Sequence, residues 1–121
     1  YLVDCGMGVT RQFVEAGYDL GQINTILLTH LHSDHCLELG PLLHTIWVSS
    51  PKREIKVYGP PRTSNLVVKF YEAMSYDIDM RIADESRKTH AGWPIAWSFR
   101  KGWCSRMTSS KSQPCRSSTR P

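Results

Sequence analysis

"THLHSDH", residues 29–35, places three histidines and one aspartate within six positions. It follows "INTILLT", residues 23–29, whose β-branched residues and leucines predict a strand. Because this run alternates poorly between polar and apolar residues, we expect a strand buried on both faces. The metal-capable side chains therefore stand where a buried strand ends.

The spacing of these side chains suits metal binding. In extended backbone, side chains two positions apart point the same way, so His30 and His32 can reach one ion while Leu31 turns toward the core. Asp34 and His35 follow where the chain leaves the strand, and neighbours at such a turn can face a second ion. Nitrogen and oxygen donors favour Zn²⁺, and Mn²⁺ or Fe would also fit. The alternative is a chance histidine cluster or a surface patch with adventitious metal affinity.

Strand and helix signals alternate through residues 1–85. Apolar runs bounded by Gly or Pro predict strands at 1–5, 23–29 and 53–59. Apolar residues at helical spacing predict helices over 9–16 with Gly17 beyond the end, over 37–48 with a break at Gly40-Pro41, and from a Thr63 or Ser64 cap along a stripe of Leu66, Phe70 and Met74. This alternation predicts one layered α/β domain.

The charge changes sharply at residue 85. Through Glu85 there are eleven acidic and seven basic residues, whereas residues 86–121 hold eight basic residues and no acidic one. The second part also holds three of the four tryptophans and shows no sustained periodicity. We predict a basic tail of little regular structure, either a disordered arm or an out-of-frame translation. The tryptophans favour the second interpretation, because disordered segments contain few aromatic residues.

Cysteine usage and hydropathy indicate a cytoplasmic protein. No secretory leader is apparent and no C-x-x-C pair occurs, so we expect free thiols in a reducing compartment. No apolar run is long enough to span a membrane. Cys5 and Cys36 are expected to be buried thiols, and His44 a packed core histidine rather than a ligand. The chain opens on Tyr1 within a predicted strand, so we expect residues to be missing before it.

The central motif carries a family resemblance. "THLHSDH" resembles the H-x-H-x-D-H motif of the metallo-β-lactamase superfamily, and "YLVDCG", residues 1–6, resembles the aspartate-bearing strand that precedes it. "ILLTHLHSDHCLELGPLL" followed by "VYGPP" is most similar to the ribonuclease Z-like branch, which cleaves phosphodiesters in RNA precursors such as those of tRNA. The resemblance covers about residues 1–85. It implies the first half of an αβ/βα sandwich, followed by an irregular C-terminal tail over 86–121.

The resemblance also implies roles for individual residues. His30 and His32 would bind a first zinc, and Asp34 and His35 a second. Asp34 would also orient the nucleophile or move a proton. Asp4 would accept a hydrogen bond from a ligand imidazole and thereby fix its tautomer. The alternative for Asp4 is a turn-forming aspartate before glycine.

The expected activity is phosphodiester hydrolysis by a hydroxide that two zinc ions activate, with RNA or another phosphodiester as substrate. The complete protein could form a homodimer. The ligand set looks incomplete, because only His44 and His90 follow His35 among the histidines and no aspartate follows Glu85. We therefore predict that the chain is an N-terminal-half fragment, unstable alone, weak in zinc binding and inactive.

Two alternatives stay open. Another hydrolase of the same fold, such as an arylsulfatase, lactonase, thioesterase or β-lactamase, would carry the same metal motif. A non-enzymatic metal-binding protein whose basic tail binds RNA or DNA is the alternative from a different class.

Overall fold

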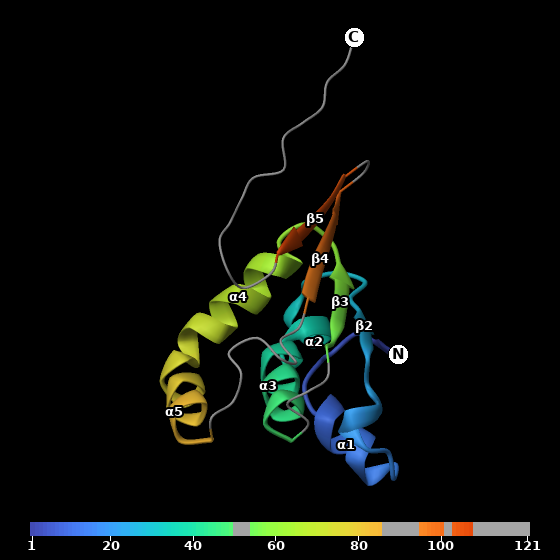
Figure 1. Cartoon of the computed structure of the whole chain (residues 1–121). Helices are drawn as coiled ribbons and strands as arrows, with labels where there is room; N and C mark the ends of the chain where they lie inside the picture. Colours follow the sequence, from blue (N-terminus) through green and yellow to red (C-terminus); the bar gives the residue numbers. More distant parts are fainter. Residues whose placement is uncertain (50–53, 86–94, 101–102, 108–121) are drawn as a thin grey trace.

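The computed structural model describes residues 1–49, 54–85, 95–100 and 103–107, the last two ranges by their backbone alone (Figure 1). The described strands form one sheet in the order β1-β2-β3-β4-β5. Neighbours among the first four strands pair in parallel, and β5 pairs antiparallel to β4. The strands are β1 (Leu2–Val3), β2 (Thr25–Leu27), β3 (Lys56–Gly59), β4 (Ile95–Arg100) and β5 (Trp103–Met107).

Helices connect the parallel strands, because a parallel pair cannot be joined by a tight turn. None of the described helices is long and apolar enough to cross a membrane. The connections contain α1 (Val9–Glu15), the 3₁₀ turn η1 (Leu20–Gln22), α2 (Ser33–Cys36), α3 (Leu39–Ser49), α4 (Thr63–Ala73) and α5 (Ser75–Glu85).

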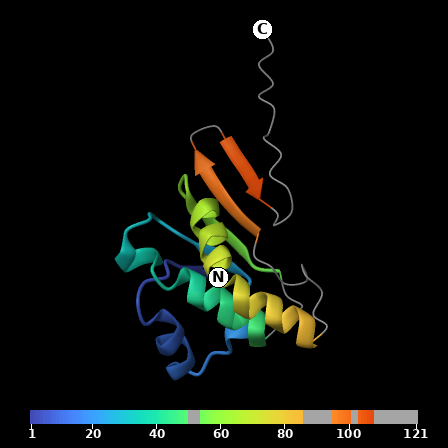
Figure 2. The same ribbon diagram turned by 90° about the vertical axis from the view of Figure 1, so that its left-hand side faces the viewer.

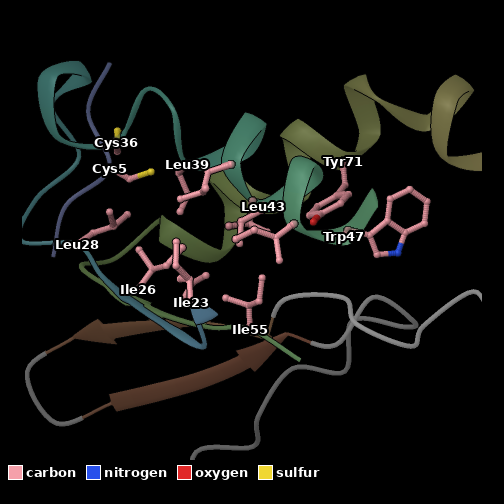
Figure 3. Close-up of a cluster of buried hydrophobic side chains, with 14 of the residues drawn as sticks. Cys5, Ile23, Ile26, Leu28, Cys36, Leu39, Leu43, Trp47, Ile55 and Tyr71 are labelled. Atoms are coloured by element: carbon pink, nitrogen blue, oxygen red, sulfur yellow. The ribbon is translucent and has the colours of Figure 1, made fainter. Parts of the chain in front are cut away.

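The core lies between α3, α4 and the sheet, as Figure 3 shows. The buried face of α3 comprises Leu39, Leu42, Leu43, Ile46 and Trp47. Side chains of the strands and the residues beside them complete the core opposite that face: Ile23, Ile26, Leu28, Ile55 and Val57. Burial of apolar area on this scale is the main stabilising contribution to such a fold. The predicted layered α/β arrangement is confirmed.

Strand β2 differs from its prediction. Ile26 is fully buried, Leu27 is 38% exposed, and Leu28 is 6% exposed. The expectation of burial on both faces is therefore wrong, because the described helices pack against one face of the sheet. On the other face, Leu27 pairs in register with Val3 and with Tyr58. Because Leu27 is apolar although it lies on the more exposed face, the sequence of β2 does not alternate between polar and apolar residues. On that face Leu27 forms a row with Val3 and Tyr58.

Helix ends follow the predictions in part. Ala16 caps α1 and Gly17 adopts a φ of 83°, as expected for a glycine just beyond a helix. The predicted break at Gly40-Pro41 is wrong, because α3 begins at Leu39 and Pro41 lies in its first turn, where a missing N–H costs little.

Helix α4 begins one or two residues earlier than predicted. Arg62, rather than Thr63 or Ser64, occupies the N-cap position, with a φ of 83°. The hydroxyl of Thr63 donates to the carbonyl of Pro60 at 2.8 Å instead of capping the helix. The predicted stripe of Leu66, Phe70 and Met74 is partly buried, and the fully buried residues beside it are Val67 and Tyr71.

Strands β4 and β5 lie within 86–121, where little regular structure was expected. Residues 95–100 and 103–107 are therefore more regular than expected for this part of the chain. Strand β4 extends the sheet beside β3, with Lys56 opposite Ile95, and Figures 1 and 2 show the β4–β5 hairpin at the opposite end of the molecule from α1. Pairing with an open strand edge uses backbone groups, so it needs no alternating side-chain pattern. The other residues of the tail, including His90, lie outside the described residues, and their predicted nature stays a prediction.

Candidate metal centre

The segment after β1 lies directly against the segment after β2. The backbone N–H of Asp4 donates to the carbonyl of Leu27 at 2.8 Å, and that of Cys5 donates to the carbonyl of His35 at 2.6 Å. Asp4 adopts a φ of 60°, a left-handed conformation that aspartate tolerates better than most residues. This turn directs the Asp4 side chain toward the end of β2.

Several hydrogen bonds of the site converge on the carboxylate of Asp4. Its carboxylate accepts hydrogen bonds from the Thr29 backbone N–H at 2.8 Å, from the Thr29 hydroxyl at 2.9 Å, and from His35 Nδ1 at 2.8 Å. Burial acts to raise the pKa of Asp4, but these hydrogen bonds outweigh it and hold the pKa below its ordinary value. Asp4 is therefore an ionised group that can only accept hydrogen bonds at neutral pH.

The hydrogen bond from His35 to Asp4 determines which ring nitrogen of neutral His35 carries the proton. Because Asp4 is an acceptor, the neutral ring carries its proton on Nδ1 and a lone pair on Nε2. That Nε2 atom lies 3.4 Å from Oδ2 of Asp34. The Asp4 carboxylate thus leaves the nitrogen nearest Asp34 without a proton, and the orienting role expected for Asp4 stays a prediction.

His30 completes a three-residue group. Its Nδ1 lies 2.9 Å from Oγ1 of Thr29, and its ring centroid lies 4.0 Å from that of His35. Among the described residues, potential ligand atoms of His30, Asp34 and His35 all lie within 4.8 Å of one another. The two histidines are half-buried and Asp34 is exposed, so the group opens to solvent.

His32 lies beside this group rather than within it. Its ring stands edge-on to that of His30, with centroids 4.7 Å apart, and the residue is exposed. Its backbone begins α2, because the His32 carbonyl accepts from the N–H groups of His35 and Cys36. The structure therefore brings three of the four predicted ligands together and places the fourth next to them.

The three-residue group fits a divalent cation. Two imidazole nitrogens and one carboxylate oxygen form a donor set that zinc accepts. Atoms that each lie about 2 Å from one ion are within about 4 Å of each other. A spread of up to 4.8 Å thus requires only small side-chain movements for binding.

Two further residues hold the surrounding backbone. A Cβ on Gly6 would lie 2.0 Å from the carbonyl oxygen of Asp34, so the close approach of the two segments requires glycine there. Glu38 accepts hydrogen bonds from the backbone N–H groups of Gly8 and Thr10, at the start of α1. Burial acts to raise the pKa of Glu38, but these bonds lower it.

The contributions of Thr29 and Glu38 were not predicted from the sequence. Thr29 directly precedes the first histidine, so a hydroxyl residue at the strand end was an available signal. Glu38 offered no local signal, because its partners lie 28 and 30 positions away in the chain.

The remaining candidates behave as predicted. Cys5 and Cys36 are free and buried, and burial raises the pKa of Cys5 to about 12, which keeps it a thiol rather than a thiolate ligand. His44 packs 5.6 Å from the ring of Trp47, and its Nε2 lies 2.8 Å from Oδ2 of Asp77. These three residues are separate from the three-residue metal group.

Comparison with known proteins extends these observations. The family model described as "Metallo-beta-lactamase superfamily" matches residues 1–93. Ribonuclease Z of Mycolicibacterium gilvum (strain PYR-GCK) is 44% identical over 86 residues, which cover 69% of this chain and 30% of that protein. Ribonuclease Z of Mycobacterium bovis (strain BCG / Pasteur 1173P2) is 39% identical over 92 residues, 74% of this chain and 33% of that protein.

A solved structure agrees with the sequence relatives. The crystal structure of human tRNase Z, short form, matches with a TM-score of 0.56 and 34% identity, over 60% of this chain and 27% of that chain. The chain therefore spans about a third of the length of the curated relatives described above.

Proposed function

The chain belongs to the metallo-beta-lactamase superfamily, and on that premise we propose that it supplies the metal-binding part of a ribonuclease Z-like phosphodiesterase acting on RNA. The observation that supports this most is the convergence of His30, Asp34 and His35 on one focus after β2. The relatives named ribonuclease Z, at 39% and 44% identity, favour RNA over a lactam, lactone, sulfate ester or thioester substrate.

The proposed ligands are His30 and His32 for one zinc ion, and Asp34 and His35 for a second. The short distances among His30, Asp34 and His35 would place the two ions close together. Zinc suits their nitrogen and oxygen donors, and Mn²⁺ or Fe are the competing ions. A bound zinc ion supplies Lewis acidity, which brings the pKa of water to about 7 and neutralises negative charge on a phosphate. Homodimerisation of the complete protein stays a prediction.

The chain's own residues have distinct tasks in this proposal. Asp4 holds the proton on Nδ1 of His35, so that Nε2 keeps its lone pair toward the site. Asp34 stands exposed beside His35, and its carboxylate is placed to orient a water molecule or take up a proton from it. Leu28 and Cys36, on either side of residues 29–35 in the sequence, are buried.

A chimera tests the proposal. The 86 matched residues of the Mycolicibacterium gilvum ribonuclease Z would be replaced by the matching residues of this chain, and cleavage of a precursor tRNA would be measured. We expect metal-dependent cleavage, which is lost when His35 is also changed to alanine. The matched control is His44→Ala in the same chimera, which should keep cleaving because His44 lies outside the metal group.

Two results would count against the proposal. A folded, zinc-loaded chimera that fails to cleave RNA would reject the assigned role for this segment. Equal activity in the His35→Ala and His44→Ala chimeras would show that the histidine cluster is not the reaction centre. Assays with bis(p-nitrophenyl) phosphate, a β-lactam and a lactone separate the phosphodiesterase from the other hydrolases of this fold.

A further inference from the structure

We infer that Thr29 is a positioning residue whose hydroxyl sets the tautomer of His30 through Asp4, so that one carboxylate prepares both histidines for a cation. The inference rests on the proposed metal site. It adds a residue that is not itself a ligand and assigns it a defined task.

The hydrogen-bond geometry carries the first step. Oγ1 of Thr29 lies 2.9 Å from Oδ2 and 3.0 Å from Oδ1 of Asp4, and 2.9 Å from Nδ1 of His30. A hydroxyl has one proton to donate, and an ionised carboxylate can only accept. The Thr29 proton therefore points to Asp4, which leaves an oxygen lone pair facing His30.

The second step follows from this direction. Since Oγ1 of Thr29 can only accept from His30, a neutral His30 ring must carry its proton on Nδ1. Its Nε2 then bears a lone pair. His35 reaches the same state by donating directly to Asp4, from Nδ1 at 2.8 Å. Both rings thus hold the Nδ1–H tautomer and keep Nε2 without a proton for a ligand role.

Threonine suits this task better than serine. Its backbone N–H also donates to Oδ1 of Asp4, at 2.8 Å, so backbone and side chain of one residue hold the same carboxylate. The branched Cβ restricts χ1 and so limits the directions in which the hydroxyl can point. A serine would keep the hydrogen bonds with more rotational freedom, and a valine would keep the shape without the hydroxyl.

Nitrogen NMR of the histidine rings tests the inference without any metal. In the 121-residue chain, at a pH where the rings are neutral, ¹⁵N shifts should report Nδ1–H for both His30 and His35. Thr29→Val should move His30 toward the Nε2–H tautomer, which neutral histidine prefers in water, and leave His35 on Nδ1–H. Thr29→Ser should restore the original His30 signal.

Zinc titration of the ribonuclease Z chimera described above gives the second measurement, because the chain alone is expected to bind zinc weakly. Thr29→Val should weaken zinc binding by about 10–100-fold, as loss of an orienting partner does at other metal sites, and Thr29→Ser should recover most of the affinity. The control is Thr45→Val on α3, whose hydroxyl bonds to the carbonyl of Pro41 and which should change neither readout.

Each outcome decides the matter. An Nε2–H tautomer for His30 in the unchanged chain would overturn the inference, even if every variant failed to fold. A Thr29→Val chain that folds and keeps His30 on Nδ1–H would also overturn it. If the tautomers behave as expected but no variant binds zinc, the positioning role stands and the proposed metal site fails.

Discussion

Two histidine–aspartate pairs in this molecule have the same length and opposite consequences. His35 contacts Asp4 at 2.8 Å through Nδ1, whereas His44 contacts Asp77 at 2.8 Å through Nε2. The first pair leaves Nε2 of His35 facing Asp34. The second leaves Nδ1 of His44 buried, with no hydrogen-bond partner in the part of the chain that the structure describes. In each pair the carboxylate takes one ring nitrogen, and the exposure of the other nitrogen decides whether it can bind a ligand.

The surroundings of the two pairs explain the difference. The His35 side chain is 35% exposed at the end of a sheet, and its aspartate is shared with Thr29. The His44 side chain is 13% exposed and joins α3 to α5, where its aspartate is shared with the Arg81 guanidinium at 2.9 Å. The His35–Asp4 pair lies at a solvent-accessible site, whereas the His44–Asp77 pair links α3 to α5.

Replacing the histidine of each pair should give the largest difference between the two pairs. His35→Ala should lower zinc affinity by more than about 100-fold, beyond the usual loss when only an orienting partner is removed. His44→Ala should leave zinc affinity unchanged and reduce the free energy of unfolding. Competition against a chromophoric chelator and urea unfolding measure the two effects. Equal losses of zinc affinity would abolish the distinction.

Two of the close-packed glycines give the next comparison. A Cβ on Gly6 would meet the Asp34 carbonyl oxygen at 2.0 Å, and a Cβ on Gly40 would meet the Phe70 ring at 2.2 Å. Each alanine variant should destabilise the fold by about 3 kcal/mol, the upper end for overpacking. Gly6→Ala alone should also weaken zinc binding, because Asp34 must move. Unchanged zinc affinity in a folded Gly6→Ala chain would show that the site tolerates displacement of this backbone.

Neutralising each aspartate should have a smaller effect. Asparagine, like aspartate, tolerates the left-handed backbone conformation of residue 4. Its side chain has only one acceptor oxygen, whereas several donors bond to the Asp4 carboxylate. Asp4→Asn should therefore lower zinc affinity by about 10–100-fold. Asp77→Asn should not affect zinc affinity. Isothermal titration of both variants with Zn²⁺ provides the measurement, and a similar loss in the two would contradict the assigned roles.

The smallest expected effect is a change in the free energy of unfolding at acid pH. The Arg81 hydrogen bond, followed by that of His44, lowers the pKa of Asp77 below its ordinary value of 3.8, although desolvation opposes it. A carboxyl whose folded pKa is lowered stabilises the fold above its unfolded pKa, and this contribution disappears as the pH falls through the lowered folded value. The stability difference between the unchanged chain and Asp77→Asn should therefore be constant just above pH 3.8 and shrink below it.

Urea midpoints across this pH range measure the difference. Asp79→Asn is the matched control, because Asp79 is exposed on the same helix. If Asp79→Asn gave the same pH dependence as Asp77→Asn, the effect would reflect overall charge rather than the link between α3 and α5.

Much of the site could be predicted from local sequence. The run before His30 identifies a strand, the spacing of the histidines and Asp34 identifies metal chemistry, and Gly17 marks a helix end. These inferences rely on backbone preferences and side-chain direction over a few residues, which neighbouring residues determine. The same reasoning separated His44 from the cluster.

Contacts between distant segments required the tertiary structure. Asp4 meets Thr29 across 25 positions, and His44 meets Asp77 across 33. No local pattern specifies such partners, because they depend on which strands pair and which face the helices cover. For the same reason the local pattern of β2 did not reveal the exposure of Leu27, and the pattern of the tail did not reveal the pairing of β4 with β3. The sequence by itself determined which side chains are candidate metal ligands, and the packing of β1 beside β2 decided which nitrogen of His35 bonds to Asp4 and which one lies beside Asp34.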